Sequence, residues 1–221
     1  MKHIFAATIS TAVSAQRTII DPRKFSTLTQ LVVNQLNIKD PSGTWTTNDV
    51  SDRLTDYGCY CFAESRNLMG NRGKPVDDQD KLCLDLFRCH SCASKFDFPG
   101  DCAFASNYGI FLDQGEFKCS TTKNTDCEKS RCECDKRFAS RIADLWTQSS
   151  GTWSFDTFYW LQRKNVKKNP TFDAEATCKS TGPVGITANN ECCGEIGERI
   201  PFDNNLMECC ADKRLTFIGQ C

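Results

Sequence analysis

Sixteen cysteines in 221 residues are the side chains whose type and number most directly imply chemistry in this chain. Thiols at this density either pair as disulfides or bind a metal ion such as zinc. The count is even, the spacing of Cys132 and Cys134 is too tight for a zinc knuckle, and His90 is the only histidine outside the N-terminus. The cysteines therefore predict a disulfide framework and no metal centre. Such a framework persists only in an oxidising compartment.

The N-terminus predicts the same compartment. Met1-Lys2-His3 is a short basic start, residues 4–13 are mostly small and apolar, and Val13-Ser14-Ala15 supplies the small residues at which signal peptidase cuts. We expect a signal peptide over residues 1–15 and a secreted, extracellular mature chain. No other stretch approaches the ~20 apolar residues that span a bilayer. The net charge of −1 gives no general attraction to nucleic acid.

Three carboxylates stand close together at Asp77, Asp78 and Asp80. They could form a calcium site. Acidic residues at the start of a helix are more simply explained by capping and by the helix dipole, and we interpret them in that way.

The elements that must position these residues are helices. An apolar stripe at spacings of three and four predicts a helix over residues 23–38, which Asp40-Pro41-Ser42-Gly43 stops. A second helix should run from Asp77 or Asp78 to Cys92, and a third from about Asp126 through Leu145. The stretch between these two helices, residues 100–119, leaves room for a short hairpin at most.

A resemblance to a known family rests on three cysteine phrases: Tyr57-Gly58-Cys59-Tyr60-Cys61, then Gly73 to Asp80 followed by Cys83 and Cys89, then Cys119-x7-Cys127-x4-Cys132-x-Cys134-Asp135. Over about residues 23–178 they resemble secreted phospholipase A2. The resemblance implies a mostly α fold in which disulfides staple two long antiparallel helices. It also implies a set of bridges, namely Cys61–Cys83, Cys89–Cys134, Cys102–Cys127 and Cys119–Cys132, with Cys59 reaching a downstream cysteine such as Cys178.

The last cysteines form a separate phrase outside this resemblance. Cys192-Cys193-Gly194, Cys209-Cys210 and Cys221 are loosely similar to the di-cysteine modules of galaxin-type extracellular proteins. The alternative is a disulfide knot that clamps the C-terminus. Because so short a segment cannot build a core, its bridges must hold it. We therefore divide the chain into a signal peptide (1–15), a phospholipase A2-like domain (16–178) and a small disulfide-rich C-terminal module (179–221). The partners of Cys92 and of the tail cysteines stay open.

The resemblance also implies where catalytic groups should lie. In the family, a histidine on the first long helix is oriented by an aspartate of the second and deprotonates the attacking water. The aspartate that follows this histidine holds calcium. When the family pattern is aligned without a gap on Cys83 and Cys89, the histidine position corresponds to Leu86 and the calcium-binding aspartate to Phe87. A later tyrosine of the family corresponds to His90. Asp135 keeps the place of the orienting aspartate.

The absence of one disulfide of the family supports this alignment. The family joins the positions of Leu82 and Arg141 by a disulfide, and both cysteines are absent here together. A leucine cannot take a proton and a phenylalanine cannot bind calcium. The loop after Cys61 is about six residues longer than in the family, and Phe62 replaces a glycine that lets carbonyls close on the ion. The sequence therefore predicts an inactive relative of the enzyme, with no cofactor.

Two alternatives give the protein an activity. His90 lies one helical turn after Leu86 and could pair with Asp135, which would make a calcium-dependent phospholipase that hydrolyses sn-2 esters. The other alternative is a lipid binder that perturbs membranes without hydrolysis. The side chains that could face lipid are Phe25, Leu28, Val32, Trp153, Tyr159 and Trp160.

The sequence favours a non-enzymatic extracellular binding or matrix scaffold. We expect its partner to be an extracellular protein or matrix component, with a phospholipid surface as the second candidate. We expect the former catalytic groove to be filled by its own side chains, or to be wide enough for only one acyl chain. Asp135 should be hydrogen-bonded there by His90 or by a tyrosine such as Tyr108, because an unpaired buried carboxylate is costly.

Overall fold

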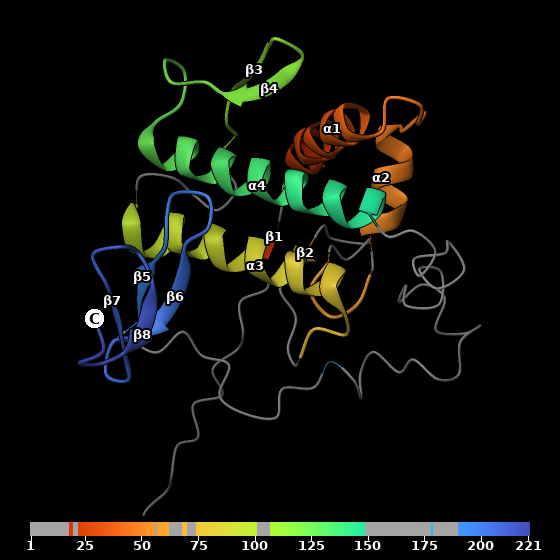
Figure 1. Ribbon diagram of the computed structural model, residues 1–221. Helices are drawn as coiled ribbons and strands as arrows, with labels where there is room; N and C mark the ends of the chain where they lie inside the picture. The colour runs from red at the N-terminus through yellow and green to blue at the C-terminus, as the bar shows by residue number, and fades with distance from the viewer. Residues whose placement is uncertain are drawn as a thin grey trace, which may run out of the picture.

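Helix α4 (Asp126–Gln148) is the central element of the fold and lies between helices α1 (Pro22–Lys39) and α3 (Asp78–Cys92). In the computed structural model α3 and α4 lie side by side and run antiparallel (Figure 1). The bridge Cys89–Cys134 joins them. The expected mostly α, disulfide-stapled architecture is confirmed. The structure describes residues 18–19, 22–55, 57–61, 68–69, 74–100, 107–148, 178 and 190–221.

The apolar stripe of α1 faces the core, because spacings of three and four place these side chains on one side of the helix. Phe25, Leu28 and Val32 are 9%, 3% and 0% exposed, and they belong to the same core as Phe138 and Ile142 of α4. The expectation that these three side chains face lipid is therefore corrected, since packing against the neighbouring helices leaves them almost no exposed surface. Outside the described residues lie the expected signal peptide and the other lipid-facing candidates, Trp153, Tyr159 and Trp160.

A short helix, α2 (Thr47–Leu54), follows α1 and was not expected from the sequence. It begins with a reciprocal cap, in which the Thr46 hydroxyl accepts from the Asp49 amide at 3.2 Å and the Asp49 carboxylate accepts from the Thr46 amide at 2.9 Å. Val50 and Leu54 are fully buried. This capping pair is a recognisable sequence signal for a helix start, so the element could have been found.

The strands are short and pair only as two-stranded antiparallel ribbons. Between α3 and α4, strands β3 (Ile110–Asp113) and β4 (Glu116–Cys119) form the expected hairpin, which turns at Gln114 and Gly115, both with positive φ. Strand β1 (Thr18–Ile19) pairs with β2 (Leu68–Met69). Helix α3 itself continues into a π-helical turn over Ala93–Asp97. Within the described part of the chain, no helix is both long enough and apolar enough to cross a bilayer.

The disulfides of the helical part follow the pairing that the resemblance implies. The structure joins Cys61 to Cys83, Cys89 to Cys134 and Cys119 to Cys132, and Cys59 reaches Cys178. Cys127 is also disulfide-bonded. Its expected partner, Cys102, lies outside the described residues. None of the described cysteines is free.

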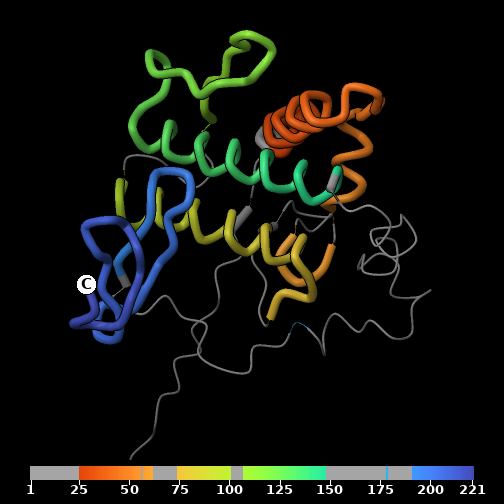
Figure 2. The backbone as a smooth tube through the Cα atoms, in the orientation of Figure 1, coloured from red at the N-terminus to blue at the C-terminus, as the bar shows by residue number. Residues whose placement is uncertain are grey.

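The described part of the C-terminal module, residues 190–221, forms two hairpins, and three of the described bridges hold it. Strands β5 (Asn190–Cys193) and β6 (Ile200–Asp203) form the first hairpin, and β7 (Met207–Cys209) and β8 (Leu215–Phe217) form the second. Two bridges, Cys193–Cys209 and Cys210–Cys221, lie within the module, whereas Cys92–Cys192 ties it to the end of α3. Figure 2 shows this blue module beside the C-terminal end of α3. Cys92, whose partner the sequence left open, is thus the attachment point.

Removing that attachment should loosen the module. The double variant Cys92→Ser, Cys192→Ser is expected to lower the free energy of unfolding by about 2–4 kcal/mol, because the bridge closes a long loop in the unfolded chain. Hydrogen exchange should rise in β5 and β6 and change little in α4. The matched control, Cys210→Ser with Cys221→Ser, opens a loop of only 11 residues at the chain end and should leave exchange in β5 and β6 unchanged. Equal exchange rates in the two double variants would contradict this role.

Candidate functional site

A histidine, an aspartate and a tyrosine meet at the seam between α3 and α4. His90 of α3 approaches Asp135 of α4, with 2.6 Å between His90 Nε2 and Asp135 Oδ1. The hydroxyl of Tyr108, which lies just before β3, donates to the other carboxylate oxygen. His90 and Asp135 are each 3% exposed. Burial raises the pKa of Tyr108 well above its usual value, and the negative charge of Asp135 raises it further. The tyrosine therefore stays protonated and keeps donating.

A buried cation lies near the same carboxylate. Arg131 precedes Asp135 by one helical turn and is only 1% exposed. Burial lowers the pKa of its guanidinium, while the charge of Asp135 acts in the opposite direction. The sequence reasoning missed Arg131. Its spacing of four residues from Asp135 was a visible signal, but nothing in the sequence showed that the arginine would be buried.

The position of the His90 ring limits what this cluster can do. A general base must hold its carboxylate partner with one ring nitrogen and present the other to a water or substrate. Here Nε2 is at Asp135, and Nδ1 has no contact with solvent. Both oxygens of Asp135 already accept hydrogen bonds. In this conformation His90 and Asp135 form a buried contact that joins two helices, and the second ring nitrogen that a general base needs does not reach solvent.

The two positions that precede this network on α3 are apolar. Leu86 is 3% exposed and belongs to the hydrophobic core, and Phe87 is partly buried against that core. Leu86 lies one turn before His90, so the side chain that the resemblance sets at the position of the catalytic histidine packs beside the network. Burying a leucine side chain stabilises a fold by about 1.5–3 kcal/mol.

Asp77 and Asp80, two of the three acidic residues at the start of α3, accept hydrogen bonds from backbone amides. Asp77 caps the helix by accepting from the amide of Asp80 at 2.9 Å, and it also accepts from the Tyr57 hydroxyl. The carboxylate of Asp80 is fully buried and accepts from the amides of Cys59 at 2.8 Å, Tyr60 at 2.6 Å and Val76 at 3.0 Å. The contact of Asp77 agrees with the capping interpretation, whereas Asp80 holds the backbone of preceding segments. Nowhere among the described residues do three or more His, Cys, Asp or Glu side chains gather in a way that could hold a metal ion.

The Tyr57–Cys61 phrase is held in place by the same aspartate. Gly58 has a φ of 53°, and a Cβ atom added there would lie 2.4 Å from the Cγ of Asp80. Only glycine therefore allows the backbone to come this close to the carboxylate. The longer loop that begins at Phe62 falls outside the described residues, apart from the short strand β2.

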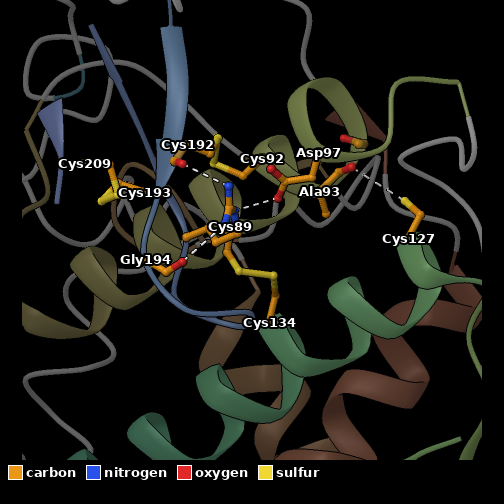
Figure 3. A network of polar contacts seen from close by, with 12 residues as sticks. Cys89, Cys92, Ala93, Asp97, Cys127, Cys134, Cys192, Cys193, Gly194 and Cys209 are labelled. Atoms are coloured by element: carbon orange, nitrogen blue, oxygen red, sulfur yellow. Dashed lines mark hydrogen bonds and ion pairs between the residues drawn. A yellow bond between two sulfur atoms is a disulfide. The ribbon is translucent and has the colours of Figure 1, made fainter. Parts of the chain in front are cut away.

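Polar contacts hold the C-terminal module against the end of α3, and the sequence reasoning did not find them (Figure 3). Arg199 donates to the carbonyl oxygens of Cys192 at 2.9 Å and Gly194 at 3.3 Å, and its Nε lies 2.7 Å from a carboxylate oxygen of Asp97. Burial raises the pKa of Asp97, and the charge of Arg199 opposes this shift. The arginine, which directly precedes β6, thus links the end of β5 to the π-helical turn. Asp97 and Arg199 are about a hundred positions apart in sequence, and no local pattern connects them.

Comparison with known proteins agrees with this geometry. A family model described as phospholipase A2 matches residues 36–151, just over half of the chain. A phospholipase A2 of Bos taurus is 34% identical over 39% of this chain and 57% of its own length. The acidic phospholipase A2 homolog textilotoxin D chain of Pseudonaja textilis is 32% identical over 46% of this chain and 64% of its own length.

A third relative extends over more of the chain. The group IIF secretory phospholipase A2 of Mus musculus is 26% identical over 65% of this chain and 80% of its own length. The chain therefore spans less than two thirds of the length of the first two relatives and more of the third. The helix pair, its bridges and the matching family model lead to one conclusion: this chain belongs to the phospholipase A2 family.

Proposed function

We propose that the protein is a secreted, non-enzymatic member of the phospholipase A2 family that serves as an extracellular binding or matrix scaffold. The observation that carries the proposal is the apolar pair Leu86–Phe87 on α3, next to a closed hydrogen-bond network at Asp135. Ester hydrolysis in this family depends on a histidine base and a calcium-binding aspartate. Leu86 and Phe87 can supply neither group.

The network at Asp135 supports a structural use of the remaining polar residues. His90 and Tyr108 occupy both oxygens of the carboxylate, which removes the cost of burying it. Hydrogen bonds that satisfy a buried carboxylate from two other elements help to stabilise and specify a core. In this proposal Asp135 is retained because it joins the helices, and no cofactor is needed.

A scaffold role also suits the disulfides. Bridges link α3 to the Tyr57–Cys61 phrase, to α4 and to the C-terminal module. A surface fixed in this way loses little conformational entropy when a partner binds. The partner we propose is an extracellular protein or matrix component, with a phospholipid surface as the second candidate. The net charge of −1 offers no general attraction to nucleic acid.

One observation favours a second candidate function. The distance of 2.6 Å between His90 and Asp135 is that of a catalytic histidine–aspartate pair. This second candidate is a calcium-dependent phospholipase in which His90 has replaced the missing base. It requires the buried Nδ1 to open to solvent and requires calcium ligands other than Phe87.

A hydrolysis assay separates the two. On mixed phospholipid vesicles we expect no release of fatty acid above background, with calcium or with chelator, and an active calcium-dependent phospholipase A2 serves as the positive control. We also expect calorimetry to show no calcium binding in the micromolar range. Calcium-dependent turnover that disappears in His90→Ala would establish the enzyme and refute the scaffold.

The conservative variant His90→Tyr tests the structural role directly. A tyrosine hydroxyl can donate to Asp135 as His90 does, so we expect its melting temperature to stay near that of the wild type. His90→Ala, which removes the partner of a buried carboxylate, should melt well below both.

A further inference from the structure

A pocket lies between α3, α4 and the first hairpin of the C-terminal module, and nothing in the proposed scaffold role accounts for it. Its volume is about 300 Å³, the lower end of the range for small-molecule sites. Leu82 and Leu86 of α3, Phe138 of α4 and Ile200 of β6 supply its apolar lining. We name it the α3–α4–β6 pocket.

The pocket exists because of two features of this chain. Leu82 and Arg141, the two positions where the resemblance implies a lost disulfide, both line it, so the space between them is not filled by a bridge. The C-terminal module closes the other side. Gly197 lies so near α4 that an added Cβ would be 3.1 Å from the Glu133 carbonyl oxygen, and Arg137 of α4 pairs with Glu198.

The pocket is separate from the buried network. His90, Asp135 and Tyr108 are not among the described residues that line it. On α4 the lining residues Cys134, Phe138 and Arg141 recur at spacings of four and three and so share a face, whereas Asp135 points about 100° away from Cys134. Occupancy of the pocket therefore does not depend on any chemistry at Asp135.

The charged side chains that line the pocket are mostly cations. The only acidic side chains among the described lining residues are Asp85 and Glu198, against four basic ones, Lys81, Arg88, Arg137 and Arg141. Asp85 is shared by two of them, with oxygen–nitrogen distances of 3.4 Å to Lys81 and 3.3 Å to Arg141. Arg88 forms no ion pair with any of the described carboxylates. Two positive charges thus remain in excess beside an apolar cavity.

We propose that the α3–α4–β6 pocket binds a single-chain anionic amphiphile, such as a fatty acid. The acyl chain lies against Leu82, Leu86, Phe138 and Ile200, and the carboxylate is held by Arg88 and Arg141. A guanidinium recognises a carboxylate with two parallel hydrogen bonds. Arg141 can turn toward such a ligand at little cost, because its side chain is 43% exposed and exposed ion pairs are weak.

Calorimetry on the full-length protein with dodecanoate, kept below its micelle concentration, tests both parts of the ligand. We expect dodecanoate to bind at least about tenfold more tightly than dodecanol, because charge-assisted hydrogen bonds contribute that much or more. Acetate, which has the head group alone, should not bind measurably. Equal affinity for dodecanoate and dodecanol would refute the role of the arginines, and no binding of dodecanoate would refute the site.

Charge variants locate the binding. Arg88→Gln with Arg141→Gln should weaken dodecanoate binding by about tenfold or more. Asp85→Asn should strengthen it by a few fold, because it frees Lys81 and Arg141 from their shared partner. The matched control, Arg214→Gln, removes an exposed arginine of the β7–β8 hairpin that does not line the pocket, and affinity should not change.

A tighter binding of dodecanoate by Asp85→Asn cannot arise from misfolding. If Asp85→Asn does not bind more tightly, and the double variant Arg88→Gln, Arg141→Gln binds dodecanoate as well as the wild type does, the proposal is overturned. A positive hydrolysis assay would overturn the scaffold role and leave this site untouched.

Discussion

Replacing Asp135 with alanine is expected to lower the free energy of unfolding by about 3 kcal/mol. The change removes the acceptor of two donors, the buried His90 ring and the partly buried Tyr108 hydroxyl, and it removes the negative charge near Arg131. Solvent has little access to replace the lost hydrogen bond of His90, because His90 and Asp135 are each 3% exposed. Urea denaturation with the disulfides intact measures the effect.

Two variants separate the network from simple loss of volume. Asp135→Asn keeps the shape of the side chain and one acceptor oxygen, so it should lower the free energy of unfolding by about half as much as Asp135→Ala does. Ala139→Gly, four residues further along α4 at a fully buried position, is the packing control and should cost about 1 kcal/mol from helix propensity. If Asp135→Ala is as stable as the wild type, the carboxylate has no structural role, and Asp135 is not retained because it joins the helices.

The second large effect is expected at Asp80, where alanine should cost about 3–4 kcal/mol. Its carboxylate is the acceptor for three backbone amides, those of Cys59, Tyr60 and Val76, and it is fully buried. Without it, the Tyr57–Cys61 phrase is still held to α3 by the Cys61–Cys83 bridge and the Tyr57–Asp77 hydrogen bond, but its backbone amides lose their acceptor. Thermal unfolding and amide exchange at Cys59 and Tyr60 should both report the loss.

Asp78 is the matched control, because it is an acidic residue in the same first turn but is exposed. Asp78→Ala should cost less than about 0.5 kcal/mol, since only the helix-dipole interaction is lost. Gly58→Ala should resemble Asp80→Ala, because its new Cβ would displace the same carboxylate. Similar stabilities for the Asp78 and Asp80 variants would mean that the carboxylate of Asp80 does not hold the loop.

Much of the helical part could be predicted because the spacing of its cysteines resembles that of a known family, and this resemblance implies which cysteines pair. Cys89 and Cys134 fix which faces of α3 and α4 meet, and with them the meeting of His90 and Asp135. Tyr108 could be named as a hydrogen-bond donor to Asp135, because a carboxylate that is buried at that seam needs partners.

Other features could not be predicted, for physical reasons. A stripe such as Phe25, Leu28 and Val32 has the same pattern whether it faces a core or lipid, and only the neighbouring helix decides. Cysteine counting allows many connectivities, so the pairing of Cys92 with Cys192 had no basis in spacing. The contact between Arg199 and Asp97, and the pocket beside the module, depend in turn on that pairing.

The connectivity of the bridges sets an order for the biosynthesis of this protein. Cys61 and Cys83 are 22 residues apart and can pair soon after both leave the ribosome, whereas Cys59 waits for Cys178 and Cys92 for Cys192, separations of 119 and 100 residues. At ~5–20 residues per second, Cys92 stays without its native partner for roughly 5–20 s. Cys89, three residues away, meets Cys134 in about half that time. The helix pair can therefore be stapled while Cys59 and Cys92 are still thiols available for exchange, and the bridge that positions the C-terminal module is among the last to close.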